Sequence, residues 1–239
     1  MRETIIKKAS SSVVAILSLL LLLIFIAAMK RPELTGTSSS RGYTYLALGD
    51  SYTIGELVKP EDNFPNQVVR LLHEKGIEVN PPRIVAKTGW TTDELQAAME
   101  NASLKKSYDF VTLLIGVNNQ YRGLKVVDYI PQFESLLKQA ISYAGNDTAH
   151  VAVLSIPDWG ATPFAYGRDR KLIASEIEEY NAAAKLVAEK YHIYFVDITT
   201  NSKQALEDHS LVTSDGLHPS PKEYSRWAEQ AVAYFQKHL

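Results

Sequence analysis

Five short apolar runs alternate along the chain with longer amphipathic segments, and this alternation limits the possible folds more than any other feature. The runs are rich in aliphatic and aromatic residues and are bounded by turn residues, which is typical of buried strands. They occupy residues 43–48, 77–87, 108–115, 151–156 and 193–198. Helical spacing of apolar residues predicts helices over 64–76, 91–102, 124–143, 172–191 and from Pro221 onward. Because crossovers between parallel strands are right-handed and place helices over the sheet, the pattern predicts an α/β fold, a three-layer αβα sandwich with a doubly wound, five-stranded parallel sheet.

Composition narrows the class of protein. The 239 residues are 46% hydrophobic, which suits one globular domain with a substantial core plus an appendage. Cysteine is absent, which excludes disulfides, thiolate metal sites, a cysteine nucleophile and a lipid-modified cysteine. The net charge is -2 and no basic stripe is present, so a nucleic-acid partner is not expected.

The N-terminal segment has the pattern of a membrane signal. A basic segment, 1–12, precedes an apolar run, 13–29, that only Ser18 interrupts. A helix of that length spans roughly 25 Å, the lower limit for crossing a bilayer. We expect an uncleaved anchor, with a cleaved signal peptide and a secreted form as the alternative, because the cleavage pattern is poor. The basic head favours an N-terminus inside and a folded domain, 43–239, on the outer side, periplasmic or at the cell surface, after a flexible linker, 30–42.

The first predicted strand ends abruptly at Gly49-Asp50-Ser51. In open α/β sheets ligands bind beyond the carboxyl ends of the strands, and Ser51 lies at such an end. Taken alone, the tripeptide is also a common turn, in which Ser51 would be an ordinary loop hydroxyl.

A second polar group precedes the last predicted helix. Ser220 is placed as its N-cap, with Pro221 at the first helical position and Glu223 closing a capping box. Asp215 can therefore reach one ring nitrogen of His218 and leave the other directed at the cleft, which is how an imidazole is held as a general base. The alternative is an Asx turn beside a surface histidine.

With these blocks in order, the chain from about Tyr45 to His218 resembles the SGNH hydrolases, also called the GDSL esterase and lipase family. The matching blocks are Gly49-Asp50-Ser51, Gly89, Gly116-Val117-Asn118-Asn119 and Asp215-Gly216-Leu217-His218-Pro219. The resemblance implies a flavodoxin-like sheet order and acyl transfer to water, with Ser51 as nucleophile, His218 as base and Asp215 as the orienting carboxylate. It assigns the oxyanion hole to the N–H groups of Ser51 and Gly89 and the side-chain amide of Asn118. No cofactor and no metal are implied, and the six histidines show no zinc-binding spacing.

Two residues depart from the family pattern. Tyr52 replaces the leucine that gives the family its name, which affects the shape of the pocket more than its chemistry. Asn119 replaces the usual aspartate of the third block, which puts a local hydrogen bond in doubt.

Aromatic residues follow several of the predicted strands and are candidates for substrate binding. They are Tyr52, Trp90, Tyr121 and Trp159, with Phe164 and Tyr166 nearby, and about half are expected to be packing residues instead. The predicted function is a serine ester hydrolase of esterase, lysophospholipase or thioesterase type, acting as a monomer on a small-molecule, lipid or glycan ester. The alternatives are an O-deacetylase acting on envelope glycans and a catalytically silent ligand-binding domain.

Overall fold

The computed structural model describes residues 42–239, which form one compact unit. The expected anchor at 13–29 and the linker before residue 42 lie outside the described residues. Within the described part of the chain, no helix has both the length and the hydropathy needed to cross a bilayer.

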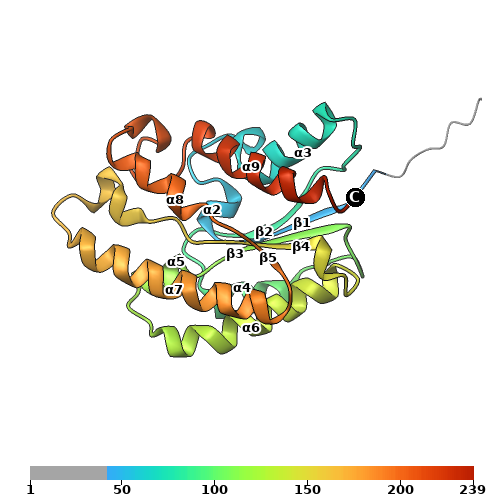
Figure 1. Ribbon diagram of the computed structural model, residues 1–239, viewed down its shortest axis with the longest axis horizontal. Coiled ribbons are helices and arrows are strands. Elements are labelled where there is room, and N and C mark those ends of the chain that lie inside the picture. The colour runs from blue at the N-terminus through green and yellow to red at the C-terminus, as the bar shows by residue number, and fades with distance from the viewer. Residues whose placement is uncertain (1–41) are drawn as a thin grey trace, which may run out of the picture. The chain divides into compact units, whose positions relative to one another are not determined.

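The centre of the domain is a parallel sheet of five strands, which confirms the predicted fold class. The strands are β1 (Tyr45–Gly49), β2 (Arg83–Ala86), β3 (Phe110–Leu114), β4 (Val151–Leu154) and β5 (Tyr194–Val196). Their order across the sheet is β2-β1-β3-β4-β5, so the order reverses at β1, between β2 and β3 (Figure 1). Leu48 of β1 lies opposite Val85 on one side and Leu113 on the other. The carboxyl ends of the strands therefore meet at one edge.

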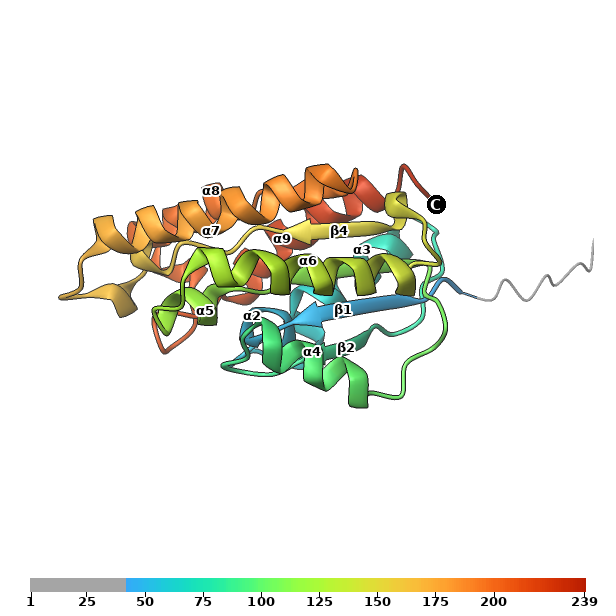
Figure 2. The ribbon, with the colours of Figure 1, turned by 90° about the horizontal axis from the view of Figure 1, so that it is seen from below.

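Helices cover both faces of the sheet. On one face lie α3 (Phe64–Glu74) and α9 (Pro221–Phe235), and on the other α4 (Thr92–Asn101), α6 (Val126–Tyr143) and α7 (Arg170–Lys190) (Figures 1 and 2). Strands β1, β3 and β4 are buried along their whole length because helices cover both of their faces. They form the core that holds the site at the sheet edge.

Both ends of the described chain lie at the amino edge of the sheet. The ring of Phe235, near the end of α9, stacks at 4.7 Å on that of Phe110, the first residue of β3. The ring of Tyr43, two residues before β1, stacks on the same phenylalanine at 5.9 Å. Figures 1 and 2 show the C-terminus beside the point where the chain enters the domain.

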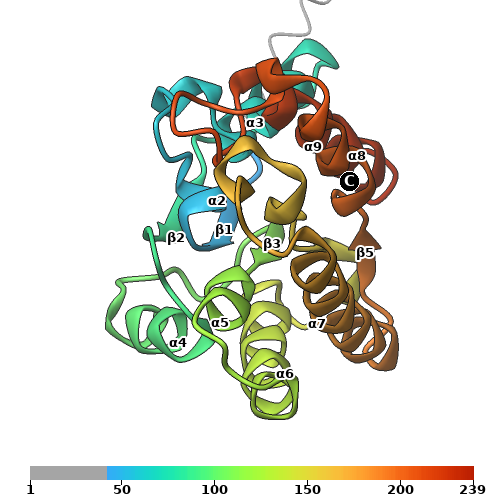
Figure 3. The same cartoon turned by 90° about the vertical axis from the view of Figure 1, so that its left-hand side faces the viewer.

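Short helices crowd the opposite, carboxyl edge. They are α2 (Ser51–Ile54) after β1, α5 (Val117–Tyr121) after β3, the 3-10 turns η3 (Trp159–Ala161) and η4 (Pro163–Ala165) after β4, and α8 (Thr199–Ser202) after β5. Figure 3 looks at this edge end-on, with α2, α5 and the segment that follows β4 around the centre. None of these short helices was predicted, because three to five residues are too few to show helical periodicity.

The second strand is shorter than predicted. The expected range was 77–87, but β2 covers only Arg83–Ala86, and before it Val79 forms a single isolated bridge with Tyr43. Pro81 and Pro82 lack the N–H groups that a ladder needs, so pairing begins only after them. The other four strands lie within, or end one residue beyond, their predicted ranges.

Candidate active site

Ser51 lies at the point where β1 turns into α2. Asp50 is the N-cap of α2, and its Oδ1 accepts a hydrogen bond of 3.0 Å from the N–H of Tyr52. A Cβ on Gly49 would lie 2.1 Å from Thr53 Oγ1 and 2.4 Å from the carbonyl oxygen of Leu114, so only glycine fits there. This sharp turn presents the hydroxyl of Ser51 at the carboxyl edge although the residue is only 5% exposed.

His218 contacts both Ser51 and Asp215. Its Nε2 lies 3.0 Å from Ser51 Oγ, and its Nδ1 lies 2.6 Å from Asp215 Oδ2. A tautomer with the proton on Nδ1 satisfies both contacts, because Nδ1–H then donates to the carboxylate and Nε2 accepts from the hydroxyl. Residues 167 positions apart in the sequence are thus joined in one line of hydrogen bonds.

Asp215 is held as an anion. Burial alone would raise its pKa, but hydrogen bonds from the His218 ring, the N–H groups of Leu217 and His218 and the Thr213 hydroxyl outweigh burial and lower the pKa to about 2. The backbone donors and the hydroxyl all bond Oδ1, at 2.8–3.0 Å, while the imidazole bonds Oδ2. A carboxylate fixed in this way orients the imidazole and stabilises its protonated form.

The loop that carries Asp215 and His218 is closed on itself. The N–H of Thr213 donates to the carbonyl of His218 at 2.7 Å, and Val212 forms an antiparallel bridge with Pro219. The Ser220 hydroxyl, at the N-cap of α9, donates to the carbonyl of Ser210 at 2.7 Å. These bonds hold the imidazole in place from both sides of the loop.

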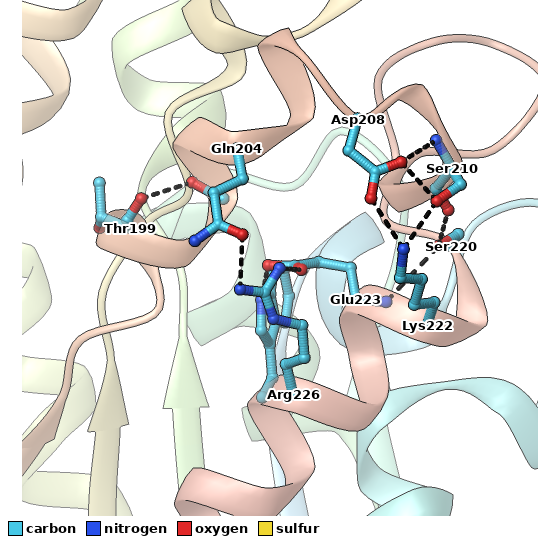
Figure 4. A network of polar contacts seen from close by, with 10 residues as sticks. Thr199, Gln204, Asp208, Ser210, Ser220, Lys222, Glu223 and Arg226 are labelled. Carbon is cyan, nitrogen blue, oxygen red and sulfur yellow. Dashed lines mark hydrogen bonds and ion pairs between the residues drawn. The ribbon is translucent and has the colours of Figure 1, made fainter.

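A polar network ties the preceding segment to the first turns of α9 (Figure 4). Lys222 Nζ lies 2.7 Å from Asp208 and 2.9 Å from the hydroxyl of Ser210. Arg226 bridges Gln204 and Glu223 at 2.9 Å each. Glu223 was expected to close a capping box, but its Oε1 instead accepts from the indole N–H of Trp227 at 2.8 Å. The Glu223 carboxylate bonds the indole because the buried indole N–H would otherwise have no hydrogen-bond acceptor in the core.

Tyr52 packs against the imidazole of His218. Its ring lies 5.7 Å from that of His218 and 6.1 Å from that of Trp227, and the residue is 3% exposed. The residue that replaces the family's leucine therefore packs against the histidine and also lines the cleft.

Ser51, Gly89 and Asn118, the predicted oxyanion donors, all line the cleft. Within the described residues, the backbone N–H groups of Ser51 and Gly89 have no hydrogen-bond acceptor. The side-chain amide of Asn118, in the first turn of α5, donates to the carbonyl of Trp90 at 2.9 Å and contacts Asp50 Oδ2 at the longer distance of 3.4 Å. The two unbonded backbone N–H groups can bind negative charge that develops on an oxygen, and the Asn118 N–H can join them if it gives up its long contact with Asp50.

Two residues of α5 and its C-cap, Asn119 and Arg122, form hydrogen bonds with the segment that follows β2. Arg122, the C-cap of α5, donates from Nη2 to the carbonyl of Gly89 at 2.6 Å and to Glu94 at 3.1 Å. Asn119 accepts from the N–H of Thr92 at 3.1 Å and donates to its hydroxyl at 2.8 Å. Asn119 therefore forms local hydrogen bonds although it is not an aspartate: its amide oxygen accepts one bond and its amide N–H donates the other.

Asp50 is a buried carboxyl group next to these donors. Burial raises its pKa from the ordinary value of 3.8 to about 7, although hydrogen bonds, including that from the Tyr52 N–H, act in the opposite direction. The group is 1% exposed, so desolvation of the charged form dominates.

A cleft of about 200 Å³ opens beside Ser51 and His218. Its apolar walls come from Tyr52, Val117, Tyr121, Trp159, Phe164 and Leu217. The indole N–H of Trp159 donates to Gln120 at 2.7 Å, which fixes the ring in the wall. Trp90 is not one of the lining residues: its side chain packs against the core, and only its carbonyl takes part, through Asn118. Tyr166 is 90% exposed and does not line the cleft either.

Some residues that support the site could not be identified from the sequence. Arg122 and Thr213 act through backbone groups or neighbouring carboxylates that only the fold brings within reach. Leu217 could have been expected at the cleft, since it directly precedes His218. Among residues 42–239, no group of three or more His, Asp or Glu side chains has the arrangement of a metal site.

Comparisons with known proteins identify the family and the fold. Residues 47–226 match the model of the GDSL-like lipase/acylhydrolase family. No curated protein matches the chain in sequence at a significant level. Among solved structures, a lipase/acylhydrolase from Enterococcus faecalis is similar, with a TM-score of 0.66 and 20% identity over 82% of this chain and 97% of that one.

Two further solved structures share the fold at low identity. A psychrotrophic esterase from Pseudoalteromonas sp., inhibited by monoethylphosphonate, has a TM-score of 0.60 and 16% identity over 82% of this chain and 98% of that one. An acetylxylan esterase from Geobacillus stearothermophilus has a TM-score of 0.59 and 19% identity over 82% and 93%, respectively. The family match spans most of the domain and confirms the resemblance seen in the sequence. The chain therefore belongs to the GDSL-like lipase/acylhydrolase family, the SGNH hydrolases, and is a carboxylic ester hydrolase.

Proposed function

We propose that the protein hydrolyses carboxylic esters through a Ser51-His218-Asp215 triad and an acyl-enzyme intermediate. The observation that carries this proposal is the unbroken line of contacts from Ser51 Oγ to His218 Nε2, 3.0 Å, and from His218 Nδ1 to Asp215, 2.6 Å, beside a cleft. Membership of a hydrolase family removes the reason to consider a silent binding domain.

The reaction proceeds in two halves. His218 Nε2 takes the proton of Ser51 Oγ as that oxygen bonds to the carbonyl carbon, and the negative charge moves to the carbonyl oxygen. The N–H groups of Ser51 and Gly89 and the amide of Asn118 bind this oxyanion. When the C–O bond to the alcohol breaks, the imidazolium returns its proton to the leaving oxygen. Water then repeats the sequence on the acyl-enzyme, with His218 as its base, and releases the acid and free Ser51.

The size of the cleft supports a short acyl group. Pockets for drug-sized ligands usually enclose about 300–1,000 Å³, and this cleft measures about 200 Å³. We infer that acetyl to octanoyl esters are better substrates than palmitoyl esters. The exposed ring of Tyr121 at the rim allows a longer chain to leave the cleft rather than fill it.

A second candidate function is removal of acetyl groups from envelope glycans. Acetyl is the smallest acyl group that such a cleft accepts, and aromatic walls suit sugar rings as well as chains. The similar structure from Geobacillus stearothermophilus is an acetylxylan esterase, a likeness of fold only. The two candidates use the same chemistry and differ in the alcohol.

Covalent labelling tests the common mechanism. A fluorophosphonate should label the protein at Ser51, with Ser51→Ala as the unlabelled control, and peptide mapping identifies the site. Hydrolysis of p-nitrophenyl acetate, butyrate, octanoate and palmitate then defines the acyl preference. Release of acetate from acetylated glycans, with poor activity on the other esters, would favour the deacetylase. Labelling that persists in Ser51→Ala would show that another residue is the nucleophile.

We further propose that residues 13–29 anchor the enzyme in a membrane with the domain on the outer side. The support is the length and hydropathy of that run and the basic residues before it. The full-length chain should sediment with membranes after a carbonate wash and be digested by protease added to intact cells or, if the domain is periplasmic, to spheroplasts. Recovery in the soluble cytoplasmic fraction would contradict both the anchor and the export readings.

A further inference from the structure

The guanidinium group of Arg168 lies close to three aromatic rings of the cleft wall. The guanidinium carbon of Arg168 lies 5.1 Å from the ring centroid of Phe164, 5.3 Å from that of Trp159 and 5.5 Å from that of Tyr121. All three rings line the cleft that contains Ser51 and His218. Arg168 itself is exposed and is not one of the lining residues, so its charge lies beside the aromatic wall of the cleft.

Arg168 has no carboxylate partner among the described residues, unlike Arg122. Arg122 is neutralised by Glu94 at 3.1 Å, and Arg170 uses its Nη1 to bind the carbonyl of Gly160. The only side-chain hydrogen bond of Arg168 in the described structure is a long one, 3.4 Å, from Nη2 to the hydroxyl of Tyr121. Most of its N–H donors therefore remain available.

Backbone hydrogen bonds hold the segment that carries Arg168. The segment after β4 is fixed by backbone bonds, including one of 3.0 Å from the N–H of Phe164 to the carbonyl of Gly216, and one of 3.1 Å from the N–H of Arg168 to the carbonyl of Ala165. Stacking on aromatic faces holds a guanidinium group in one orientation and leaves its edge free to bind a carboxylate or phosphate.

We propose that Arg168 is an anion-binding subsite of the cleft, and that the preferred ester carries a carboxylate or phosphate group next to the part that lies against Tyr121, Trp159 and Phe164. This inference rests on the proposed function, since it concerns the substrate of the same site. The anion is fixed by the guanidinium edge, while the rings bind the apolar or sugar portion that separates the anion from the ester.

Matched ester pairs test the proposal and locate the anion. On the alcohol side the pair is 4-acetoxybenzoate and 4-acetoxybenzamide; on the acyl side it is p-nitrophenyl hydrogen adipate and p-nitrophenyl methyl adipate. The measured quantity is the ratio of kcat/KM for the anionic ester to that for its neutral partner. Wild type is compared with Arg168→Gln, Arg168→Lys and Lys171→Gln. Lys171 is also exposed and its loss removes one positive charge from the adjoining turn of α7, so it controls for general electrostatics.

The expected result is a ratio that falls by about 2- to 5-fold in Arg168→Gln for one of the two pairs, as an exposed ion pair allows. Arg168→Lys should give an intermediate ratio, because it keeps the charge but loses the planar fork, and Lys171→Gln should keep the wild-type ratio. Added salt should lower the wild-type ratio toward that of Arg168→Gln. Thermal unfolding checks that each variant folds.

Two results would overturn the inference. If the ratio is the same in wild type and Arg168→Gln for both pairs, while the neutral esters are hydrolysed in a Ser51-dependent way, the subsite is wrong and the proposed function stands. If Ser51→Ala hydrolyses all four esters as fast as wild type does, the proposed function fails, and this inference fails with it.

Discussion

Arg122 donates a hydrogen bond of 2.6 Å to the carbonyl oxygen of Gly89. The arginine is the C-cap of α5, the helix that also carries Asn118, while Gly89 belongs to the loop after β2 and has a φ of 86°. The contact therefore couples two of the three proposed oxyanion donors, which come from different strands of the sheet. Arg122 touches no reacting atom and is a positioning residue.

We expect Arg122→Ala to lower kcat about tenfold with little change in KM. The loss should be smaller than that from removing a donor outright, about 10²–10³-fold, because the donors remain but are less well placed. Added guanidinium should restore part of the activity of Arg122→Ala. A kcat equal to that of wild type would show that the loop keeps its geometry without this bond.

Substitutions in the proposed triad should abolish turnover without unfolding the protein. We expect Ser51→Ala and His218→Ala each to lower kcat to near background, and Asp215→Asn to lower it by about 10²-fold or more, since the imidazole then loses its anionic partner. Stopped assays with p-nitrophenyl acetate and circular dichroism check both points. Ester hydrolysis near the wild-type rate by folded Ser51→Ala would refute the triad.

The two adjacent asparagines should differ in what they affect. Asn118→Ala is expected to lower kcat by about 10²-fold with a nearly unchanged KM, because an oxyanion donor acts mainly in the transition state. Asn119→Ala should instead lower the free energy of unfolding by about 1–3 kcal/mol, since it leaves the buried N–H of Thr92 without an acceptor. Kinetics and urea denaturation of both variants separate these effects, and the reverse pattern would exchange their roles.

Asp50 should make the stability of the domain depend on pH. Its pKa is about 7 in the folded protein because of burial, against an ordinary value of 3.8. Between these two values the folded state retains a proton that the unfolded state releases, so the free energy of unfolding falls as the pH rises from about 4 to about 7, by at most about 1.4 kcal/mol per pH unit. Below that window the contribution is absent, and above it the loss is constant.

Asp50→Asn tests this dependence, since asparagine keeps the N-cap oxygen but does not ionise. Urea denaturation at a series of pH values should show the variant gaining stability relative to wild type as the pH rises through the window. A difference that does not change with pH would mean that Asp50 titrates normally in the folded protein.

The sequence was sufficient for the sheet and for the residues that end its strands. Buried runs such as β3 and the turn residues after them are local features, so the five strands and the positions of Ser51, Asn118 and His218 followed from pattern and family resemblance. The second strand was predicted too long, because the pattern of apolar residues does not show which N–H groups have partners.

Long-range choices of side chains could not be predicted in this way. Glu223 satisfies all the sequence rules for a capping box, but the indole of Trp227, one turn later, takes its carboxylate. Trp90 and Phe164 are both aromatic residues near a strand end, and only the folded loops place Phe164 in the cleft and Trp90 against the core. Such competition between equally suitable partners is decided by tertiary packing.

Tyr43 and Phe235 both contact Phe110 at the amino edge of the sheet, whereas Ser51 lies at the carboxyl edge. A tag, a resin or a fused protein joined at either end of the domain is therefore attached on the side away from the cleft. Immobilisation through Leu239 should leave the hydrolysis of small soluble esters unchanged, so the enzyme can work while fixed to a solid support.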